Sequence, residues 1–513
     1  MSGAAPERPP LPLDRFRWIT EPLEYWAAET PDRIGATDPF AAFSFAAFQG
    51  TVERLAQDFE DRGLLPGDRV MIVMENCLAG AAAMLAAARM RAWAVPLNAR
   101  LSAREIDAIR AHCRPRLLVY TAGVSPDALA HGERHGAEAL AALGPLEALV
   151  AEDPEAAPEP VSDDPAQQVA ALIYTTGTTG APKGVMLTHD NLIFIAGRSS
   201  QRREVCVEDR VHAVLPISHV FGLSSVFLGT LYQGARLDLI ARFEPRAVAR
   251  ALAEEGITVF QGVPQMFARL MSLLDEGASD LPAPKLRYIS AGGSPLERAL
   301  KARVEGLWGR PLHNGYGMTE TSPTVSTTLS ERPAADDSTG PALQDVEVRI
   351  AGKDDEALPT GEVGEVWARG RLVMKGYYRE PEMTAAAVTP EGWFRTGDLG
   401  RLTEEGELYI VGRLKELIIR SGFNVYPPEV EAVVASHPDV ALAAVIGRPL
   451  PGNEEVVAFV QPVPGKVLEL KELRAFVEPR LAAYKQPADY IVLEELPSGS
   501  TGKPLKHKLR DYL

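Results

Sequence analysis

Apolar runs alternate with helix-like segments between Arg69 and Tyr120, and this alternation constrains the fold more than any other feature of the sequence. RVMIVM is followed by an alanine-rich segment and AVPLN, and RLLVY comes after a helix that Ser102 and Glu105 begin as a capping box. More strand–helix rounds follow VHAVLP. Such alternation is typical of mostly parallel sheets with helices on their faces, so we predict an α/β fold with two doubly wound sheets. The later helices are expected at Val248–Glu255, from Gln265 onward, and at Leu296–Trp308.

The rest of the chain has a different pattern. A connector rich in proline and acidic residues spans 153–168, and short alternating strands with glycines between Asp345 and Arg379 predict a small β-barrel. After ELYIVGR the sequence predicts a smaller α+β unit, with helices at Glu429–Ala435 and Lys471–Leu481. We therefore predict a large domain over residues 1–412 and a small one over residues 413–513.

Composition narrows the class of protein. The 513 residues include 53 Lys and Arg against 69 Asp and Glu, a net charge of −16, and such a chain repels a nucleic acid. The most apolar stretch, Leu78–Leu97, contains Arg89 and Arg91 and is therefore unsuitable as a membrane span. The cysteines lie far apart, and the N-terminus lacks the pattern of a signal peptide. We expect a cytoplasmic monomer or homodimer without an integral membrane segment.

The segment YTTGTTGAPKG, Tyr174–Gly184, follows the apolar strand VAALI directly. Its glycines let backbone N–H groups curl around an anion, its threonines add hydroxyl donors, and Lys183 adds a positive charge. It is not a Walker A loop, because Pro182 precedes the lysine and a glycine follows it. A flexible polar linker is the alternative interpretation, but we predict a phosphate-binding loop. Its candidate residues are Thr175, Thr176, Gly177, Thr178, Thr179, Gly180 and Lys183.

Four further motifs follow in order: HNGYGMTETSP, TGD, ELYIVGRLKELIIRSGFNVYPPEVE and SGSTGKPLKHKLR. With the phosphate loop, they make the chain similar, over nearly its whole length, to the AMP-forming adenylating superfamily. This superfamily includes acyl- and aryl-CoA synthetases, firefly luciferase and the adenylation domains of peptide synthetases. The resemblance implies ATP, Mg²⁺ and coenzyme A as co-substrates and cofactor, and a C-terminal domain that moves.

The resemblance also implies roles for single residues. Glu320 would contact Mg²⁺, and Lys503 would swing in to contact the carboxylate and the α-phosphate. Lys415 would be the hinge between the domains. The residues implied in catalysis are Lys503, Thr319, Glu320 and His219, whereas Lys506, His507, Lys508 and Arg510 are expected to form a solvated basic tail. The implied ATP-binding residues, besides the phosphate loop and Lys503, are Gly315, Tyr316, Gly317, Thr319, Asp398 and Arg413.

The acid and the thiol would meet beside these residues. Candidates for the acyl pocket are small or apolar: Val220, Phe221, Phe227, Val263, Gly292, Gly293, Gly315 and Thr324. A second carboxylate would be costly to bury there, and Gly315 stands where the malonate ligases of the family carry arginine, so malonate is disfavoured. Ser421, Gly422 and Phe423 would face coenzyme A.

The predicted function is that of an AMP-forming carboxylate–CoA ligase acting on a medium- or long-chain fatty acid, a choice that rests on analogy. An aryl-acid ligase of the coumarate or benzoate type is the alternative, followed by an adenylating enzyme with another acceptor. A luciferase-like oxygenase would share every motif. An amino-acid-activating module is disfavoured because VFGLSSVFLG has no acidic residue, and a non-catalytic binding protein because the motif set includes Lys503.

Overall fold

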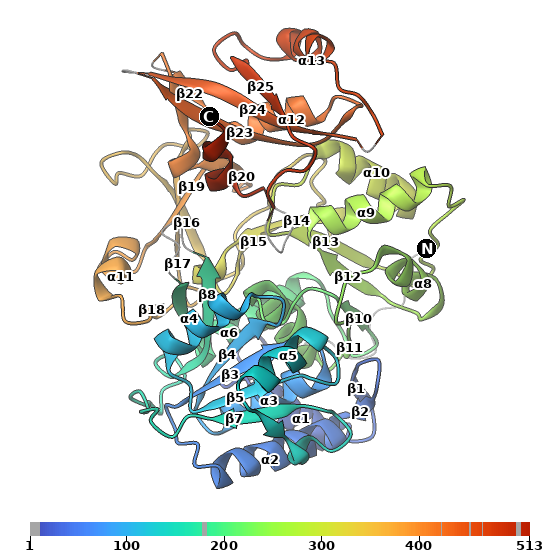
Figure 1. The fold of residues 1–513 in the computed structure, drawn as a ribbon, viewed down its shortest axis with the longest axis vertical. Helices are drawn as coiled ribbons and strands as arrows, with labels where there is room; N and C mark the ends of the chain where they lie inside the picture. Colours follow the sequence, from blue (N-terminus) through green and yellow to red (C-terminus); the bar gives the residue numbers. More distant parts are fainter. Residues whose placement is uncertain (1–10, 177–181, 422, 451–452, 464, 499–503) are drawn as a thin grey trace.

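Two eight-stranded mixed sheets carry most of the chain (Figure 1). The computed structural model describes residues 11–176, 182–421, 423–450, 453–463, 465–498 and 504–513. Helices pack on both faces of each sheet, so the two predicted doubly wound units are confirmed.

The first sheet has parallel strands at its centre. In spatial order it consists of β18 (Gly376–Tyr377), β9 (Pro182–Thr188), β8 (Val169–Thr176), β4 (Trp93–Asn98), β3 (Arg69–Met74), β5 (Leu117–Tyr120), β7 (Leu149–Glu152) and β6 (Glu138–Ala139). Strand β3 is buried on both faces: Val70 and Ile72 join a core with α2 (Phe45–Asp61) and α3 (Leu78–Arg89), whereas Met71 and Val73 pack with α4 (Ala103–Cys113). Burial on both faces explains why RVMIVM is continuously apolar. The predicted capping box of Ser102 and Glu105 begins α4.

The second sheet runs in the spatial order β15 (Thr324–Thr327), β14 (Leu312–Gly317), β13 (Tyr288–Gly292), β12 (Val259–Gly262), β10 (Arg210–Ala213), β11 (Arg236–Leu239), β1 (Ile34–Thr37) and β2 (Ala42–Ser44). One face shares its core with the first sheet through α6 (His189–Arg202). The other face is covered by α8 (Pro245–Glu254), α9 (Pro264–Asp275) and α10 (Arg298–Trp308). Glycines that the sequence analysis assigned to the site lie at the carboxyl ends of two neighbouring strands: Gly292 ends β13, and Gly315 and Gly317 are in the last part of β14.

The two units are interleaved along the chain. Strands β1 and β2 precede the first sheet in sequence but belong to the second, whereas β8 and β9 follow the connector 153–168 and close the first. Three predicted helix starts were late by one to three residues, because α8, α9 and α12 (Pro427–Ala435) each begin on a proline, which is well tolerated in the first turn. The helix predicted from Leu296 begins two residues later, at Arg298. The remaining helices of the large unit are α1 (Glu21–Glu29), α5 (Pro126–Arg134), α7 (Gly229–Gln233) and α11 (Pro381–Ala387).

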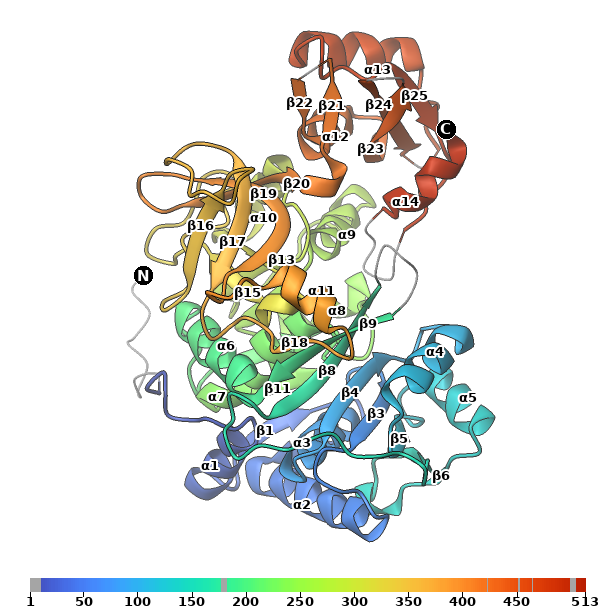
Figure 2. The ribbon, with the colours of Figure 1, turned by 90° about the vertical axis from the view of Figure 1, so that its left-hand side faces the viewer.

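The small barrel predicted after Asp345 is an open sheet. Its antiparallel strands lie in the order β16 (Glu347–Ala351), β17 (Gly364–Arg369), β19 (Phe394–Leu402) and β20 (Leu408–Arg413). A closed barrel needs its first and last strands to pair, and four strands leave no interior for side chains, so β16 and β20 remain edges. Figure 2 shows this sheet between the two large sheets and the C-terminal part.

The C-terminal part is an α+β unit reached through a 3₁₀-helix, Leu414–Glu416. It contains the hairpin β21 (Ile418–Arg420) with β22 (Phe423–Val425), a sheet of β23 (Val440–Leu450), β24 (Asn453–Pro462) and β25 (Asp489–Val492), and helices α12, α13 (Leu470–Val477) and α14 (Lys506–Leu509). The predicted helix Lys471–Leu481 ends early because a short 3₁₀-helix, Glu478–Arg480, contains Pro479.

The prediction of a solvated tail was wrong for Lys506. Its ammonium nitrogen lies 2.6 Å from Oε2 of Glu416 and 2.8 Å from Oε1 of Glu431. Burial alone would lower the pKa of Lys506, but the two carboxylates outweigh it and raise that pKa. Because Glu416 follows the expected hinge residue Lys415, this contact ties the end of the chain to the hinge. His507, Lys508 and Arg510 are exposed, as expected.

Within the part of the chain that the structure describes, no helix is long and apolar enough to cross a bilayer. The most apolar candidate, α3, has 12 residues, whereas a spanning helix needs about 20.

Candidate active site

Motifs that are far apart in the sequence meet where β14, β19 and β20 adjoin. The phenol of Tyr316, on β14, donates a hydrogen bond of 2.8 Å to Oδ2 of Asp398, on β19. The other carboxylate oxygen lies 3.3 Å from Nε of Arg413, which is opposite Asp398 in the β19–β20 register. Burial and then the Asp398 carboxylate raise the pKa of Tyr316 well above its usual value, so the phenol stays a donor. The structure thus brings together three residues expected to hold adenosine.

Glu320 follows the end of β14, in the 3₁₀-helix Thr319–Thr321. Its Oε1 accepts a hydrogen bond of 2.9 Å from the hydroxyl of Tyr377, and its backbone carbonyl accepts one of 2.9 Å from the N–H of Met374. Burial, together with the Glu320 carboxylate, raises the pKa of Tyr377. Sequence reasoning missed Tyr377, since it is 57 residues from Glu320 and lies in no motif used for the resemblance.

This arrangement fits a magnesium ion held mainly by ATP. No group of three or more His, Cys, Asp or Glu side chains is placed to hold a metal among the residues with described structure. Mg²⁺ in nucleotide sites commonly uses only one or two carboxylates besides the phosphates, so a single carboxylate such as Glu320 suffices. Lys183 is also close, with its ammonium nitrogen 5.9 Å from the centre of the Tyr377 ring.

The phosphate loop is described at its two ends. Thr175 and Thr176 end β8, and they pair with Lys183 and Pro182 of β9. The strand predicted before the glycine-rich segment is therefore present as β8, and the segment is followed by the antiparallel strand β9. Five expected residues lie outside the described parts of the chain: Gly177, Thr178, Thr179, Gly180 and Lys503.

The residues expected around the acyl group meet at the end of β13. A Cβ built at Gly292 would lie 3.2 Å from Cε1 of Phe221 and 3.5 Å from the carbonyl oxygen of Gly315. Gly293 has φ +79°, and a Cβ there would lie 3.8 Å from Cγ1 of Val263. The Phe221 ring thus packs directly against Gly292, at the end of β13.

The other residues expected near the acyl group differ in how far they are buried. Thr324 bonds through its hydroxyl to Ser225, 3.1 Å away, on the π-helix Phe221–Leu228. Val220 and Phe227 have no exposed surface and belong to the main core. His219 is exposed at the start of the π-helix, where its Nδ1 accepts a hydrogen bond of 3.4 Å from the N–H of Phe221.

Three of the residues expected at the hinge and near coenzyme A are described, and these three are at the surface. Lys415 is exposed in the 3₁₀-helix between β20 and β21. Ser421 donates its N–H to Oδ1 of Asn453 at 2.6 Å. Phe423 is 55% exposed although it stacks on Tyr484 with ring centres 4.7 Å apart. Gly422 is outside the described residues.

Comparison with known proteins agrees with this geometry. Residues 23–378 match the model of the AMP-binding enzyme family, and residues 429–503 match that of the AMP-binding enzyme C-terminal domain. The chain is 36% identical to a feruloyl-CoA synthase of an Amycolatopsis species, over 91% of this chain and 94% of that protein. It is 33% identical to the long-chain-fatty-acid–CoA ligase FadD13 of Mycobacterium tuberculosis, over 91% and 92%.

A solved structure is similar over nearly the whole chain. ATP-bound MatB from Rhodopseudomonas palustris is 28% identical, with a TM-score of 0.84 over 97% of this chain and 98% of that one. The two family models match the large and the small part of the chain. Three residues expected to bind the nucleotide, Tyr316, Asp398 and Arg413, are in contact in the structure. The chain therefore belongs to the AMP-binding enzyme family and is an AMP-forming carboxylate–CoA ligase that uses ATP, Mg²⁺ and coenzyme A.

Proposed function

We propose that the acid is a compact aromatic carboxylic acid. The observation that carries this proposal is that the ring of the half-buried Phe221 packs on Gly292 at the end of β13, where the carbonyl oxygen of Gly315 also lies. A planar acyl group would stack on the side of the Phe221 ring that does not contact Gly292, where offset aromatic stacking adds to the burial of apolar surface. Similarity to a feruloyl-CoA synthase supports the same class of acid.

A fatty acid, as the sequence suggested, is the second candidate, and similarity to FadD13 favours it. A long alkyl chain would need a tunnel beyond Phe221. Val220 and Phe227, the next candidate wall residues, have no exposed surface in the structure. Opening a tunnel there would require core side chains to repack, at a cost that a compact ring avoids.

The site residues would act mainly by positioning and by balancing charge. In the first half-reaction a carboxylate oxygen of the acid attacks the α-phosphorus of ATP, and pyrophosphate leaves. In the second, the thiolate of coenzyme A attacks the acyl carbonyl carbon, AMP leaves, and the thiol proton passes to solvent. Mg²⁺, when bound, neutralises charge on the phosphates.

We assign the roles as follows. Asp398 accepts the ribose hydroxyls and Arg413 holds that carboxylate from the other side. Lys183 and Thr175 bind phosphate oxygens, and Thr319 adds a hydroxyl to the α-phosphate. Tyr316, Gly315 and Gly317 border the adenine and the acyl group, and His219 lies where acid and thiol meet.

The test is exchange of labelled pyrophosphate into ATP without coenzyme A, on a panel of aryl and fatty acids. We expect aromatic acids to support exchange best. Exchange with medium- or long-chain fatty acids alone would favour the second candidate. If ATP binds but no acid supports exchange, the proposed adenylating site is wrong.

A methyl group at Gly292 should narrow the acyl site. In Gly292→Ala the new Cβ lies 3.2 Å from the Phe221 ring, so the ring must shift toward the substrate. We expect kcat/KM for acids with a ring to fall about 10-fold, because a change of one methylene-sized group in an apolar pocket commonly has an effect of this size. The kcat/KM for short-chain acids should fall less. Relative kcat/KM values over an acid series measure this change.

Phe221→Leu provides the matched rescue. In the double variant the leucine leaves room for the alanine, so the preference for short acids should disappear. Gly293 is a poor probe because any side chain at φ +79° strains the backbone. An unchanged acid profile in folded Gly292→Ala would place the acyl group elsewhere.

A further inference from the structure

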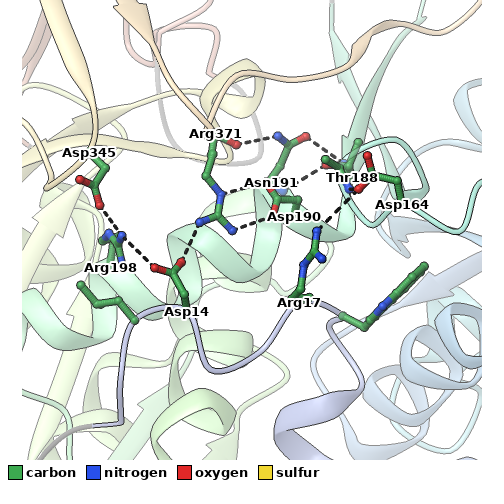
Figure 3. A network of polar contacts seen from close by, with 12 residues as sticks. Asp14, Arg17, Asp164, Thr188, Asp190, Asn191, Arg198, Asp345 and Arg371 are labelled. Carbon is green, nitrogen blue, oxygen red and sulfur yellow. Dashed lines mark hydrogen bonds and ion pairs between the residues drawn. The ribbon is translucent and has the colours of Figure 1, made fainter.

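A short segment, residues 371–377, joins a polar network on one side to Glu320 on the other. We call it the 371–377 strap. Arg371 opens the strap, and its guanidinium binds both oxygens of Asp190 at 3.0 and 2.6 Å. Asp14, near the N-terminus, accepts a further bond of 2.7 Å (Figure 3). A two-pronged contact of this kind fixes the direction of the arginine as well as its position.

The backbone of the strap is held by the first turn of α6. The amide nitrogen of Asn191 donates to the carbonyl oxygens of Arg371 and Val373, at 2.7 and 3.0 Å. Figure 3 shows Asp190 and Asn191 on the same helix end, with Arg371 between them and Asp14. Asn191 itself is fixed by the capping box with Thr188. The outer side of the strap is therefore attached to a buried helix.

The inner side of the strap holds the segment that carries Glu320. The hydroxyl of Ser322 donates to the carbonyl of Leu372 at 2.8 Å, and Met374 donates its N–H to the carbonyl of Glu320 at 2.9 Å. At the far end, Tyr377 lies on β18, pairs with Val185 of β9, and reaches Oε1 of Glu320 with its hydroxyl, also at 2.9 Å. Both the backbone and the carboxylate of Glu320 are thus bound by one anchored segment.

We propose that Tyr377 is a positioning residue for the magnesium–ATP complex. It holds Oε1 of Glu320 by a hydrogen bond and so leaves Oε2 directed at the cation. A carboxylate that is free to rotate would lose side-chain entropy on binding the ion, and a hydrogen bond to its other oxygen removes part of that cost. This inference rests on the proposed function, with Glu320 as the carboxylate that contacts Mg²⁺.

The test measures how strongly Mg²⁺ tightens ATP binding. The dissociation constant of ATP is measured by calorimetry, without acid or coenzyme A, once with saturating Mg²⁺ and once with a chelator. The ratio of the two constants is the coupling between metal and nucleotide. We expect Tyr377→Phe to reduce this ratio about 10-fold, within the range seen when a partner of a metal ligand is lost.

Tyr378→Phe is the matched control, because it removes the neighbouring hydroxyl, which binds Glu159 instead of Glu320. Glu320→Gln distinguishes the role of Glu320 as the contact to Mg²⁺ from the role of Tyr377 in positioning it. If Glu320→Gln keeps the full coupling, the proposed role of Glu320 fails. If it loses the coupling while Tyr377→Phe keeps it, only the role of Tyr377 fails.

Two further outcomes complete the test. Equal loss of coupling in Tyr378→Phe would show a general effect of packing and would overturn the inference. Loss in Tyr377→Phe and Glu320→Gln, with coupling kept in Tyr378→Phe, supports it. Thioester formation by Tyr377→Phe from a supplied acyl-adenylate should stay within about 2-fold of wild type, because no phosphate chain is present in that step.

Discussion

Lys503→Ala should slow formation of the acyl-adenylate by about 10²–10³-fold, the range expected when one well-placed stabilising donor is removed from a transition state. In the first half-reaction negative charge moves between the acid, the α-phosphate and pyrophosphate. A lysine that contacts both the carboxylate and the α-phosphate lowers the energy of the transition state in which this charge moves. Formation of the thioester from a supplied acyl-adenylate should remain largely intact, because the role that the resemblance implies for Lys503 belongs to the first step.

The measurement is the rate of each half-reaction separately, with the adenylate supplied for the second. Lys508→Ala is the matched control, since Lys508 is an exposed lysine of the same tail. Its two rates should equal those of the unaltered protein. If Lys503→Ala loses both steps equally, the lysine serves folding or a shared site, and the account of two alternating domain arrangements is wrong.

Lys415→Pro should have the opposite effect and slow thioester formation at least 10-fold while adenylation continues. Lys415 lies in a short 3₁₀-helix, whose φ values are close to the one that proline imposes. The proline ring would then restrict the backbone dihedral at Lys415, about which the resemblance implies that the small domain rotates. Its effect therefore falls on the step that needs rotation.

Lys415→Ala distinguishes the backbone from the side chain. It removes the ammonium group but leaves φ free, so both half-reactions should proceed at nearly normal rates. Equal slowing of both steps in Lys415→Pro would indicate damage to Leu414–Glu416, which also holds the Lys506 contact. Slow thioester formation in Lys415→Ala would assign the effect to the charge instead of the hinge.

The residues expected to bind the nucleotide show which contacts can be predicted from sequence motifs. TGD and VGR pointed to Asp398 and Arg413 separately, and the pairing of β19 with β20 then placed them opposite each other. A hairpin joins strands that are close in sequence, so this contact could be anticipated from local pattern. Tyr377 and Glu320 are different: they are 57 residues apart, and the pairing of β18 with β9 places Tyr377 where its hydroxyl reaches Glu320.

Lys506 is a residue for which the local sequence predicted the wrong environment. Among neighbouring basic residues it looked like part of a solvated tail, and a charge run usually is one. The fold places Glu416 and Glu431 around it, and a lysine with two carboxylate partners can be buried. Its partners come from residues about 75 to 90 positions earlier, so no local pattern could reveal them.

The sequence by itself determined the strand–helix alternation, the class of chemistry and the identity of most candidate residues, because these depend on side-chain type and on spacing over a few residues. Tertiary structure alone decided that β1 and β2 complete the second sheet, that Phe221 lies on Gly292, that Lys506 pairs with Glu416 beside the expected hinge and that Tyr377 binds Glu320. Each of these contacts joins distant segments. They form only when many apolar surfaces are buried together, and the free energy of that burial belongs to the whole fold and to no single stretch of sequence.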